Sequence, residues 1–143
     1  MASRNIADLS PAMQVYYNKF NDRCRRDVDL QKMGCSVLVT CTYRSGDEQD
    51  RLYAQGRTAP GAIVTNAKAG KSAHNATTPQ GAPAAAAFDV VPVVDGKPVW
   101  DGKHPAWAVI GAHGKAVGLK WYGDPDAAFH ELPHFQDPDW RKP

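Results

Sequence analysis

The sequence lacks long hydrophobic runs, a strong net charge, paired cysteines and an apolar leader, and each absence excludes a class of protein. Uninterrupted apolar runs such as 84–88 are far too short to cross a bilayer, so we expect no membrane insertion. The net charge of +2 is far from the basic balance of a nucleic-acid-binding domain, so no nucleic-acid partner is expected. The start of the chain, MASRNIADLS, holds no apolar segment of the kind that signal peptides carry. The three cysteines form no C-x-x-C pair, which disfavours a disulfide framework and favours synthesis in a reducing cytoplasm.

The composition that is present is that of an ordinary globular domain. Of the 143 residues, 43% are hydrophobic and 22% are charged, which suits one folded core and argues against wholesale disorder. We therefore expect residues 1–143 to form a single domain, with no residues left for a second module. We also expect the protein to be a monomer.

Three helices are predicted, and each is marked at both ends. Ser10 and Pro11 supply an N-cap and a first-turn proline, and Gly34 ends the region that follows. The apolar residues of this first helix recur at three- and four-residue spacing and form one face: Met13, Tyr16, Tyr17, Phe20 and Cys24. A capping box, Ser45 with Glu48, begins a second helix that closes at Gly56, and a third helix runs from Pro105 to Gly118.

Short strands are predicted between these helices. Asp95-Gly96 is a strong hairpin turn, and Pro92 and Pro98 beside it suggest that the hairpin lies at a sheet edge. Helices and strands alternate irregularly, so we predict an α+β fold rather than a parallel βαβ sheet. The expected strands are 35–43, 88–94, 98–100, 119–122 and 134–136.

Glu131 and His134 form the first cluster that could carry chemistry. Pro133 makes the stretch between them rigid and non-helical, so the two side chains are held at a fixed offset. A zinc hydrolase needs such a pair, with the histidine binding metal and the glutamate taking a proton from the attacking water. The alternative is a surface loop with an incidental Glu and His, and by itself the E-x-x-H spacing does not exclude it.

His74, in the stretch Ser72-Ala73-His74, and Asp89 form a second cluster. Asp89 lies inside the apolar stretch 88–94, where an unpaired carboxylate would be expensive to bury. Metal coordination by two histidines and a carboxylate would remove that penalty. The alternative, that Asp89 points to solvent from an alternating strand, stays equally open on the residues alone.

Arg44 follows one strand and precedes a helix, so its guanidinium could be aimed into a cleft, although a surface salt bridge is the usual role of an arginine. His104 and His113 adjoin or lie within a helix and are expected to be structural or exposed. His130 ranks below His134 because adjacent side chains diverge. The cysteines have no metal-ligand spacing and are expected to be small buried hydrophobic residues.

Six motifs follow one another in order: Y-R-S-x-x-x-Q at 43–49, LYAQGR at 52–57, IVTNAKAGKSAHN at 63–75, AFD at 87–89, GLKW at 118–121 and PHFQ at 133–136. Together they resemble the single-domain phage endolysins that are L-alanyl-D-glutamate peptidases. These enzymes are related to the D-alanyl-D-alanine carboxypeptidases and dipeptidases, within a wider group that includes lysostaphin-type enzymes and the hedgehog signalling domain. The resemblance covers roughly residues 37–136, most of the chain.

The resemblance implies a zinc peptidase with a small, mainly antiparallel sheet packed against helices, as in the hedgehog and D-Ala-D-Ala-peptidase folds. It implies that His74, Asp89 and His134 bind Zn²⁺. Glu131 is then the general base, which later passes its proton to the leaving amine. Arg44 would stabilise the oxyanion, and the resemblance assigns to Ser72 a contact with substrate or with the residues around the site.

One departure from the family pattern lies between the first two ligands. Relatives usually carry S-x-H-x-x-x-x-A-x-D, whereas Asp89 here stands 15 positions after His74. The segment from Asn75 to about Ala84 fills the extra length without a large apolar residue. We expect it to be an exposed, passive loop, because doubling a loop costs only about 0.6 kcal/mol in closure entropy.

The function implied by the resemblance is hydrolysis of the L-alanyl-D-glutamate bond in the peptidoglycan stem peptide, leading to cell-wall lysis. No separate cell-wall-binding domain is expected. We expect synthesis in the host cytoplasm and action on the wall after release through a separate membrane pore. The alternatives are a D-alanyl-D-alanine carboxypeptidase or dipeptidase, and a non-catalytic zinc-containing domain that binds the wall.

Overall fold

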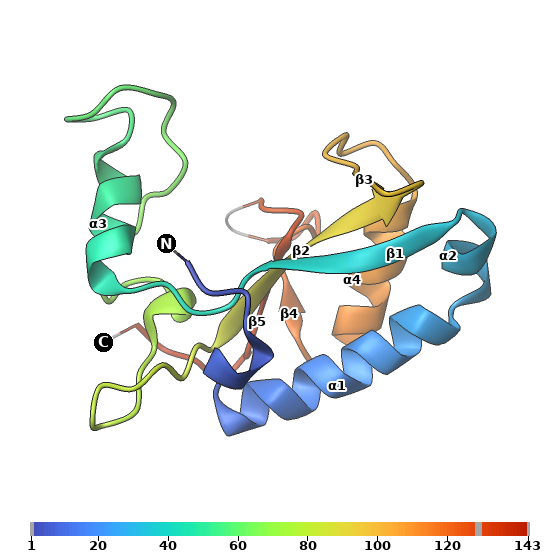
Figure 1. Ribbon diagram of the computed structural model, residues 1–143, viewed down its shortest axis with the longest axis horizontal. Helices are drawn as coiled ribbons and strands as arrows, with labels where there is room; N and C mark the ends of the chain where they lie inside the picture. Colours follow the sequence, from blue (N-terminus) through green and yellow to red (C-terminus); the bar gives the residue numbers. More distant parts are fainter. Residues whose placement is uncertain (1, 128–129, 143) are drawn as a thin grey trace.

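The computed structural model describes residues 2–127 and 130–142 and has the α+β architecture that the sequence predicts (Figure 1). The five strands of these residues form one antiparallel sheet in which β2 lies between β1 on one side and β5 with the short β3 on the other, and β4 pairs with β5. The strands are β1 (Cys35–Cys41), β2 (Ala87–Val94), β3 (Lys97–Pro98), β4 (Lys120–Trp121) and β5 (His134–Gln136). The helices are α1 (Pro11–Arg26), α2 (Val28–Lys32), α3 (Gly46–Ala54) and α4 (Ala106–Ala116), with 3₁₀ turns η1 (Ile6–Asp8) and η2 (Ala73–Asn75).

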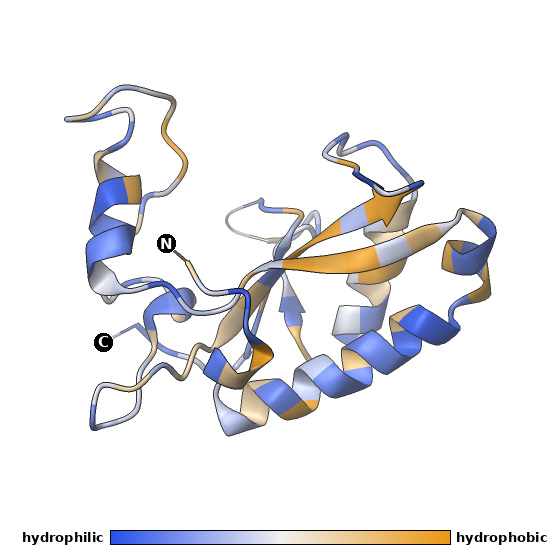
Figure 2. Cartoon of the chain, in the orientation of Figure 1, coloured by the Kyte–Doolittle hydropathy of each residue, from blue (hydrophilic) through white to orange (hydrophobic). Residues whose placement is uncertain are grey.

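The hydrophobic core lies between α1, α4 and one face of the sheet. The ring of Phe20 on α1 packs against Phe88 of β2 and Phe135 of β5, with centroids 5.3 and 5.1 Å apart. All three rings are almost fully buried. Figure 2 shows the complementary pattern, with apolar residues along β1 and β2 and polar residues on the outer side of α1.

The alternation of side chains along β2 and β5 separates the core from a polar face. Phe88 and Phe135 point to the helices, so their neighbours Asp89 and His134 point to the opposite face of the sheet. η2 lies on that opposite face, where Nε2 of its His74 is 3.1 Å from Oδ1 of Asp89.

The first predicted helical region is two helices rather than one. Ser10 caps α1 by accepting a hydrogen bond from Met13 N, as its sequence position predicts. The chain leaves the helix at Asp27, whose side chain accepts from Leu30 N and caps α2. Gly34, at φ +64°, then turns the chain into β1. The N-cap at Asp27 therefore starts a second helix within the region that the sequence predicted as one helix.

The expectation that the hairpin after β2 lies wholly at a sheet edge is wrong for Pro92. β2 is a central strand, with Pro92 opposite Val37 of β1. The Pro92 carbonyl accepts a hydrogen bond from Val99 N, 2.8 Å away. In a strand, the nitrogen and the carbonyl of one residue face the same side. The ring nitrogen of Pro92 therefore faces the gap between the pairing of β2 with β5, which ends at Asp89, and its pairing with β3, which begins at Val93. A missing N–H is tolerated there because no strand requires it. Pro98, on β3, does lie at the edge.

The helix α3 and the loop that follows it stand apart from the sheet and flank the polar face (Figure 1). Ser45 caps α3 by accepting from Glu48 N, as predicted. Within the described residues, no helix is long and apolar enough to span a membrane. The expectation of a single domain over 1–143 stays a prediction.

Candidate metal centre and catalytic groove

The three residues expected to bind metal lie together on the polar face of the sheet. Asp89 and His134 are direct cross-strand partners in the pairing of β2 with β5, and η2 places His74 beside them. Nε2 of His74 lies 3.1 Å from Oδ1 of Asp89, and Nδ1 of His134 lies 3.0 Å from the same oxygen. Two imidazole nitrogens therefore converge on one carboxylate oxygen.

The other nitrogen of each imidazole is held by an oxygen that can only accept a hydrogen bond. Nδ1 of His74 lies 2.7 Å from the carbonyl oxygen of Thr42, and Nε2 of His134 lies 2.8 Å from Oε1 of Gln136. The proton of each neutral ring therefore belongs on that outer nitrogen, which leaves a lone pair on the nitrogen facing Asp89. Two lone pairs and a carboxylate are a donor set that fits a divalent cation such as zinc.

Electrostatics at this cluster favours positive charge. Burial alone would lower the pKa of His74, but the Asp89 carboxylate outweighs burial and raises that pKa to about 10. Burial alone would raise the pKa of Asp89, but the two histidines hold it well below its usual range. The Asp89 carboxylate is thus ionised at neutral pH, and it attracts either protons on the rings or a metal cation.

Cys41 lies beside this cluster and was missed by sequence reasoning, which treated it only as a small buried residue. Its Sγ lies 3.6 Å from Nδ1 of His74, and Cys41, His74 and Asp89 together could hold a metal ion among the described residues, with ligand atoms within 4.8 Å of one another. The thiol is buried, and Cys41 stands opposite Asp89 where the β1–β2 register shifts. A register shift has no signature in spacing, so the sequence offered no signal for this neighbour.

Glu131 lies in the same pocket as the three residues. Its backbone N–H donates to Tyr122 O, 2.8 Å away, and its carbonyl accepts from His134 N, so the turn before β5 positions it. Burial raises the pKa of the Glu131 carboxyl, and Asp89 adds to the rise, while the nearby histidines and Arg44 oppose it. A carboxylate with a raised pKa holds a proton more firmly than an exposed glutamate does.

Arg44 is held at the side of the pocket by buried partners. Its Nη1 donates to Oε1 of Gln49, 3.0 Å away, and its Nη2 lies 3.6 Å from Cys41 Sγ. Its Nε is buried with no hydrogen-bond partner among the described residues. Gln49 is fully buried and also donates to Ala67 O, at 2.8 Å, so it ties the arginine to the loop after α3. Gln49 is the last residue of the motif at 43–49, but the motif by itself predicted no role for it.

Ser72 caps η2 rather than only facing the pocket. Its Oγ accepts a hydrogen bond from His74 N, 3.2 Å away, which fixes the turn that carries the histidine. Asn75 completes the cap, and its amide also donates to Arg44 O at 2.8 Å. Ser72 lines the pocket as well, so a contact with substrate stays a prediction beside this supporting role.

The remaining histidines lie elsewhere, as expected. His130 bonds to Gly123 O, at 3.1 Å, and His104 accepts from Ala106 N at the start of α4. His113 on α4 lies 2.7 Å from Asp27 and joins that helix to the α1–α2 junction. None of the three lines the pockets that contain Glu131 and His134, within the described part of the chain.

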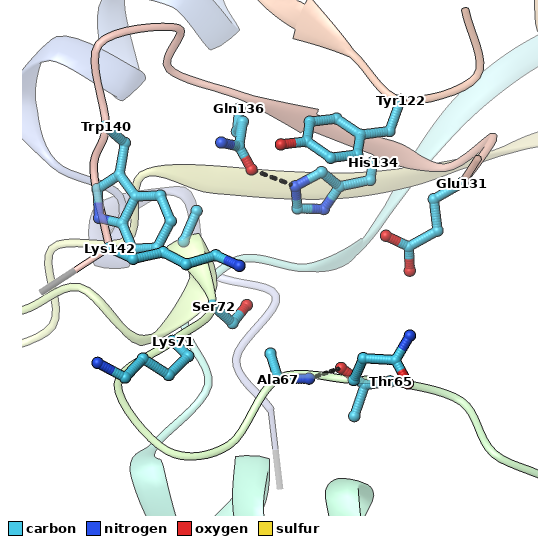
Figure 3. Close-up of a pocket in the computed structure, with 12 residues that line it drawn as sticks. Thr65, Ala67, Lys71, Ser72, Tyr122, Glu131, His134, Gln136, Trp140 and Lys142 are labelled. Atoms are coloured by element: carbon cyan, nitrogen blue, oxygen red, sulfur yellow. Dashed lines mark hydrogen bonds between the residues drawn. The ribbon is translucent and has the colours of Figure 1, made fainter. Parts of the chain in front are cut away.

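The groove consists of two adjoining pockets that share Thr65, Ser72, Glu131 and His134. The first, of about 300 Å³, holds Arg44, His74 and Asp89, and the second, of about 230 Å³, extends to Trp140 and Lys142. Figure 3 shows Glu131 and His134 on one side of the second pocket and the loop with Thr65, Ala67 and Ser72 on the other. The candidate metal centre thus lies in the first pocket, and His134 borders the second pocket as well.

The segment 75–84 forms a small exposed excursion, as predicted. Thr77 pairs with Pro83 in an isolated antiparallel bridge, and Ala84 N donates to Ala76 O, so the two ends of the excursion are close together. Its tip, 79–83, is exposed, and the excursion projects from the molecule in Figure 1. Its first residue, Asn75, is not passive, because its side chain helps to cap η2, the turn that carries His74.

No family model matches the chain, but it is similar to a curated protein in sequence and to a solved structure in fold. The chain is 34% identical over 111 residues to the peptidoglycan L-alanyl-D-glutamate endopeptidase CwlK of Bacillus subtilis. The match covers 72% of this chain and 61% of CwlK, so the chain spans less than two thirds of that relative. The crystal structure of the L-Ala D-Glu endopeptidase ChiX of Serratia marcescens matches with a TM-score of 0.58 at 17% identity, over 95% of this chain and 87% of ChiX. The comparisons confirm the resemblance to this type of peptidase, and the ChiX match confirms the α+β fold.

Proposed function

We propose that the protein is a zinc-dependent peptidoglycan endopeptidase that hydrolyses the L-alanyl-D-glutamate bond of the stem peptide. The observation that carries the proposal is the convergence of His74 Nε2 and His134 Nδ1 on one oxygen of Asp89, with Glu131 in the same groove. The similarity to CwlK and the shared fold with ChiX, both of that activity by name, support the choice of substrate.

His74, Asp89 and His134 would hold the metal, and the acceptors at the outer nitrogens of the two histidines suit that role. Two imidazoles and a carboxylate are a donor set typical of catalytic zinc, with a further coordination position left open. When bound, zinc supplies a Lewis acid for the scissile carbonyl and lowers the pKa of a coordinated water. Replacing His134 by alanine is expected to abolish stoichiometric zinc binding, and normal zinc content in that variant would contradict the assignment.

Glu131 would act as the general base and then the general acid. Its carboxylate faces the groove, and its raised pKa suits a group that must first accept the proton of the attacking water and then hold it. The same proton can then pass to the amine that leaves when the peptide bond breaks. Neither role requires a large movement, since the carboxylate already lines both pockets.

Arg44 would stabilise the negative charge that develops on the carbonyl oxygen. Gln49 and Cys41 hold two of its three nitrogens, so the guanidinium keeps one orientation toward the groove. Its pocket also contains His74 and Asp89, which places the positive charge on the same side as the candidate metal centre. A pre-oriented cation is more effective than a mobile one because no reorganisation accompanies the reaction.

The test is digestion of purified peptidoglycan with and without a chelator, followed by identification of the new termini. New N-terminal glutamate supports the proposal, whereas released D-alanine indicates a carboxypeptidase or dipeptidase, and intact peptidoglycan with bound protein indicates a wall-binding domain. Glu131→Gln is the matched control, because it keeps the shape of the side chain but cannot take a proton. It is expected to retain zinc and to lose most hydrolysis.

An endolysin of phage origin, synthesised in the host cytoplasm and released through a separate pore, remains the biological role that the motifs suggest. Its test is expression in the bacterial cytoplasm with and without a pore-forming partner. Lysis that depends on the pore would support this role, and lysis without it would oppose it.

A further inference from the structure

The second pocket of the groove is closed at one end by the segment 137–142, which is built into the fold. Asp137 N donates to Ala86 O, 2.9 Å away, so the segment continues the pairing of β5 with the chain before β2. Trp140 N donates to Asp137 O, and the Trp140 side chain packs against a small apolar cluster of Ala73, Ala86 and Ala87. These contacts hold the segment against the same turn that carries His74.

Lys142 is the cation that this segment presents to the groove. Arg141 bends back and donates through Nη1 to the carbonyls of Pro138 and Trp140, at 2.9 and 3.0 Å. Lys142 lines the pocket, and in Figure 3 its side chain runs from beside Trp140 into the pocket. Lys71 also lines this pocket, but its amine points away from the cavity in the same view.

We propose that Lys142 binds a free carboxylate of the substrate residue on the leaving-amine side of the scissile bond. The inference rests on the proposed function, in which that residue is a glutamate. Glutamate has two carboxyl groups, and an internal position in a peptide uses one of them, so one carboxylate stays free. The alanine on the acyl side offers no charge. The amine of Lys142, in the pocket beyond Glu131 and His134, matches this free charge, and on that ground the proposal assigns the second pocket to the leaving-amine side.

The expected energy of this contact is modest, because Lys142 is solvent-exposed. An exposed ion pair changes kcat/KM by about fivefold, and salt weakens it. Lys142 is therefore a specificity residue, distinct from the groups that carry the reaction. Its effect should appear as a preference for an acidic over an amidated substrate.

The experiment compares two peptides that differ only in whether the free carboxylate of the glutamate is left as an acid or converted to an amide. Wild type is expected to prefer the acid about fivefold in kcat/KM. Lys142→Met should abolish this preference, and Lys142→Arg should restore most of it. Lys97→Met is the matched control, because Lys97 lies exposed on β3, outside the groove. An unchanged preference in Lys142→Met would overturn the inference.

A binding measurement separates this inference from the proposed function. The zinc-loaded Glu131→Gln protein is titrated calorimetrically with both peptides, with and without Lys142→Met. A preference for the acid that requires Lys142 supports the inference even if wild type releases no glutamate terminus from peptidoglycan. Equal affinity for the acid and the amide in the protein that retains Lys142 overturns it, even if hydrolysis of peptidoglycan is confirmed.

Discussion

Replacing Gln136 by leucine tests the structural basis of the candidate metal centre most directly. Oε1 of Gln136 lies 2.8 Å from Nε2 of His134, and both side chains are buried. Leucine keeps a similar volume but removes the acceptor, so nothing fixes the ring in the tautomer that directs a lone pair toward Asp89. Loss of such a partner typically weakens metal binding by about 10- to 100-fold, or about 1.4–2.7 kcal/mol.

The same replacement should also lower the stability of the metal-free protein. The N–H of His134 would be buried without an acceptor, which costs about 1–3 kcal/mol in the free energy of unfolding. Gln136→Glu should behave differently, because a carboxylate still accepts the hydrogen bond and makes the imidazole more basic. His74 allows no equivalent change, since its acceptor is the backbone carbonyl of Thr42.

The assay is competition between the protein and a chromophoric chelator for zinc, with urea unfolding of the metal-free protein in parallel. Gln80→Leu is the matched control, because Gln80 is exposed at the tip of the 75–84 excursion. We expect weaker zinc binding in Gln136→Leu, near-normal binding in Gln136→Glu and no change in Gln80→Leu. Wild-type zinc affinity in Gln136→Leu would refute the argument that this hydrogen bond orients a ligand.

Three further predictions follow from the same groove. Glu131 must be ionised to accept a proton, and its pKa is raised. We therefore expect kcat/KM to fall as the pH is lowered through a value above the ordinary glutamate pKa of about 4.3. A pH profile with no acid limb in that region would contradict the role of Glu131. Arg44→Ala should lower kcat by about 100-fold while zinc content stays normal, and single-turnover kinetics with equal rates would exclude an oxyanion role. Deleting 76–83 should leave zinc binding intact and cleavage within about tenfold of wild type, because the two ends of the excursion already lie close together, with Ala84 N 3.0 Å from Ala76 O. Loss of zinc would show that the excursion shapes the ligand geometry.

Local signals in the sequence determined the elements of the fold. Ser10 and Ser45 cap the helices that they were expected to cap, and Asp95-Gly96 joins β2 to β3 as predicted. These features depend on side-chain hydrogen bonds and backbone conformations within a few residues, so the sequence displays them directly. The spacing of His134 and Gln136, two apart on one strand, likewise places them on one face.

The motifs also predicted several residues of the candidate site, because their types and order resemble one peptidase family. Residue types, however, leave open whether Asp89 faces solvent or metal. The structure brings it to His74 and His134, which are 15 and 45 positions away along the chain. That proximity follows from the β2–β5 register and from the packing of η2, and neither is visible as a local pattern.

Only the tertiary structure showed which groups surround these residues. Cys41 reaches His74 through a register shift, Gln49 holds Arg44, and Lys142 enters the groove because Trp140 packs on an alanine cluster. Pro92 could occupy a central strand because its missing N–H faces the space between β5 and β3. The contacts of Cys41 with His74 and of Trp140 with the alanine cluster join segments that are distant in sequence, so their free energy depends on how the whole chain closes around the sheet. Gln49 is only five positions from Arg44, but the loop after α3, to which it also bonds, holds it in place.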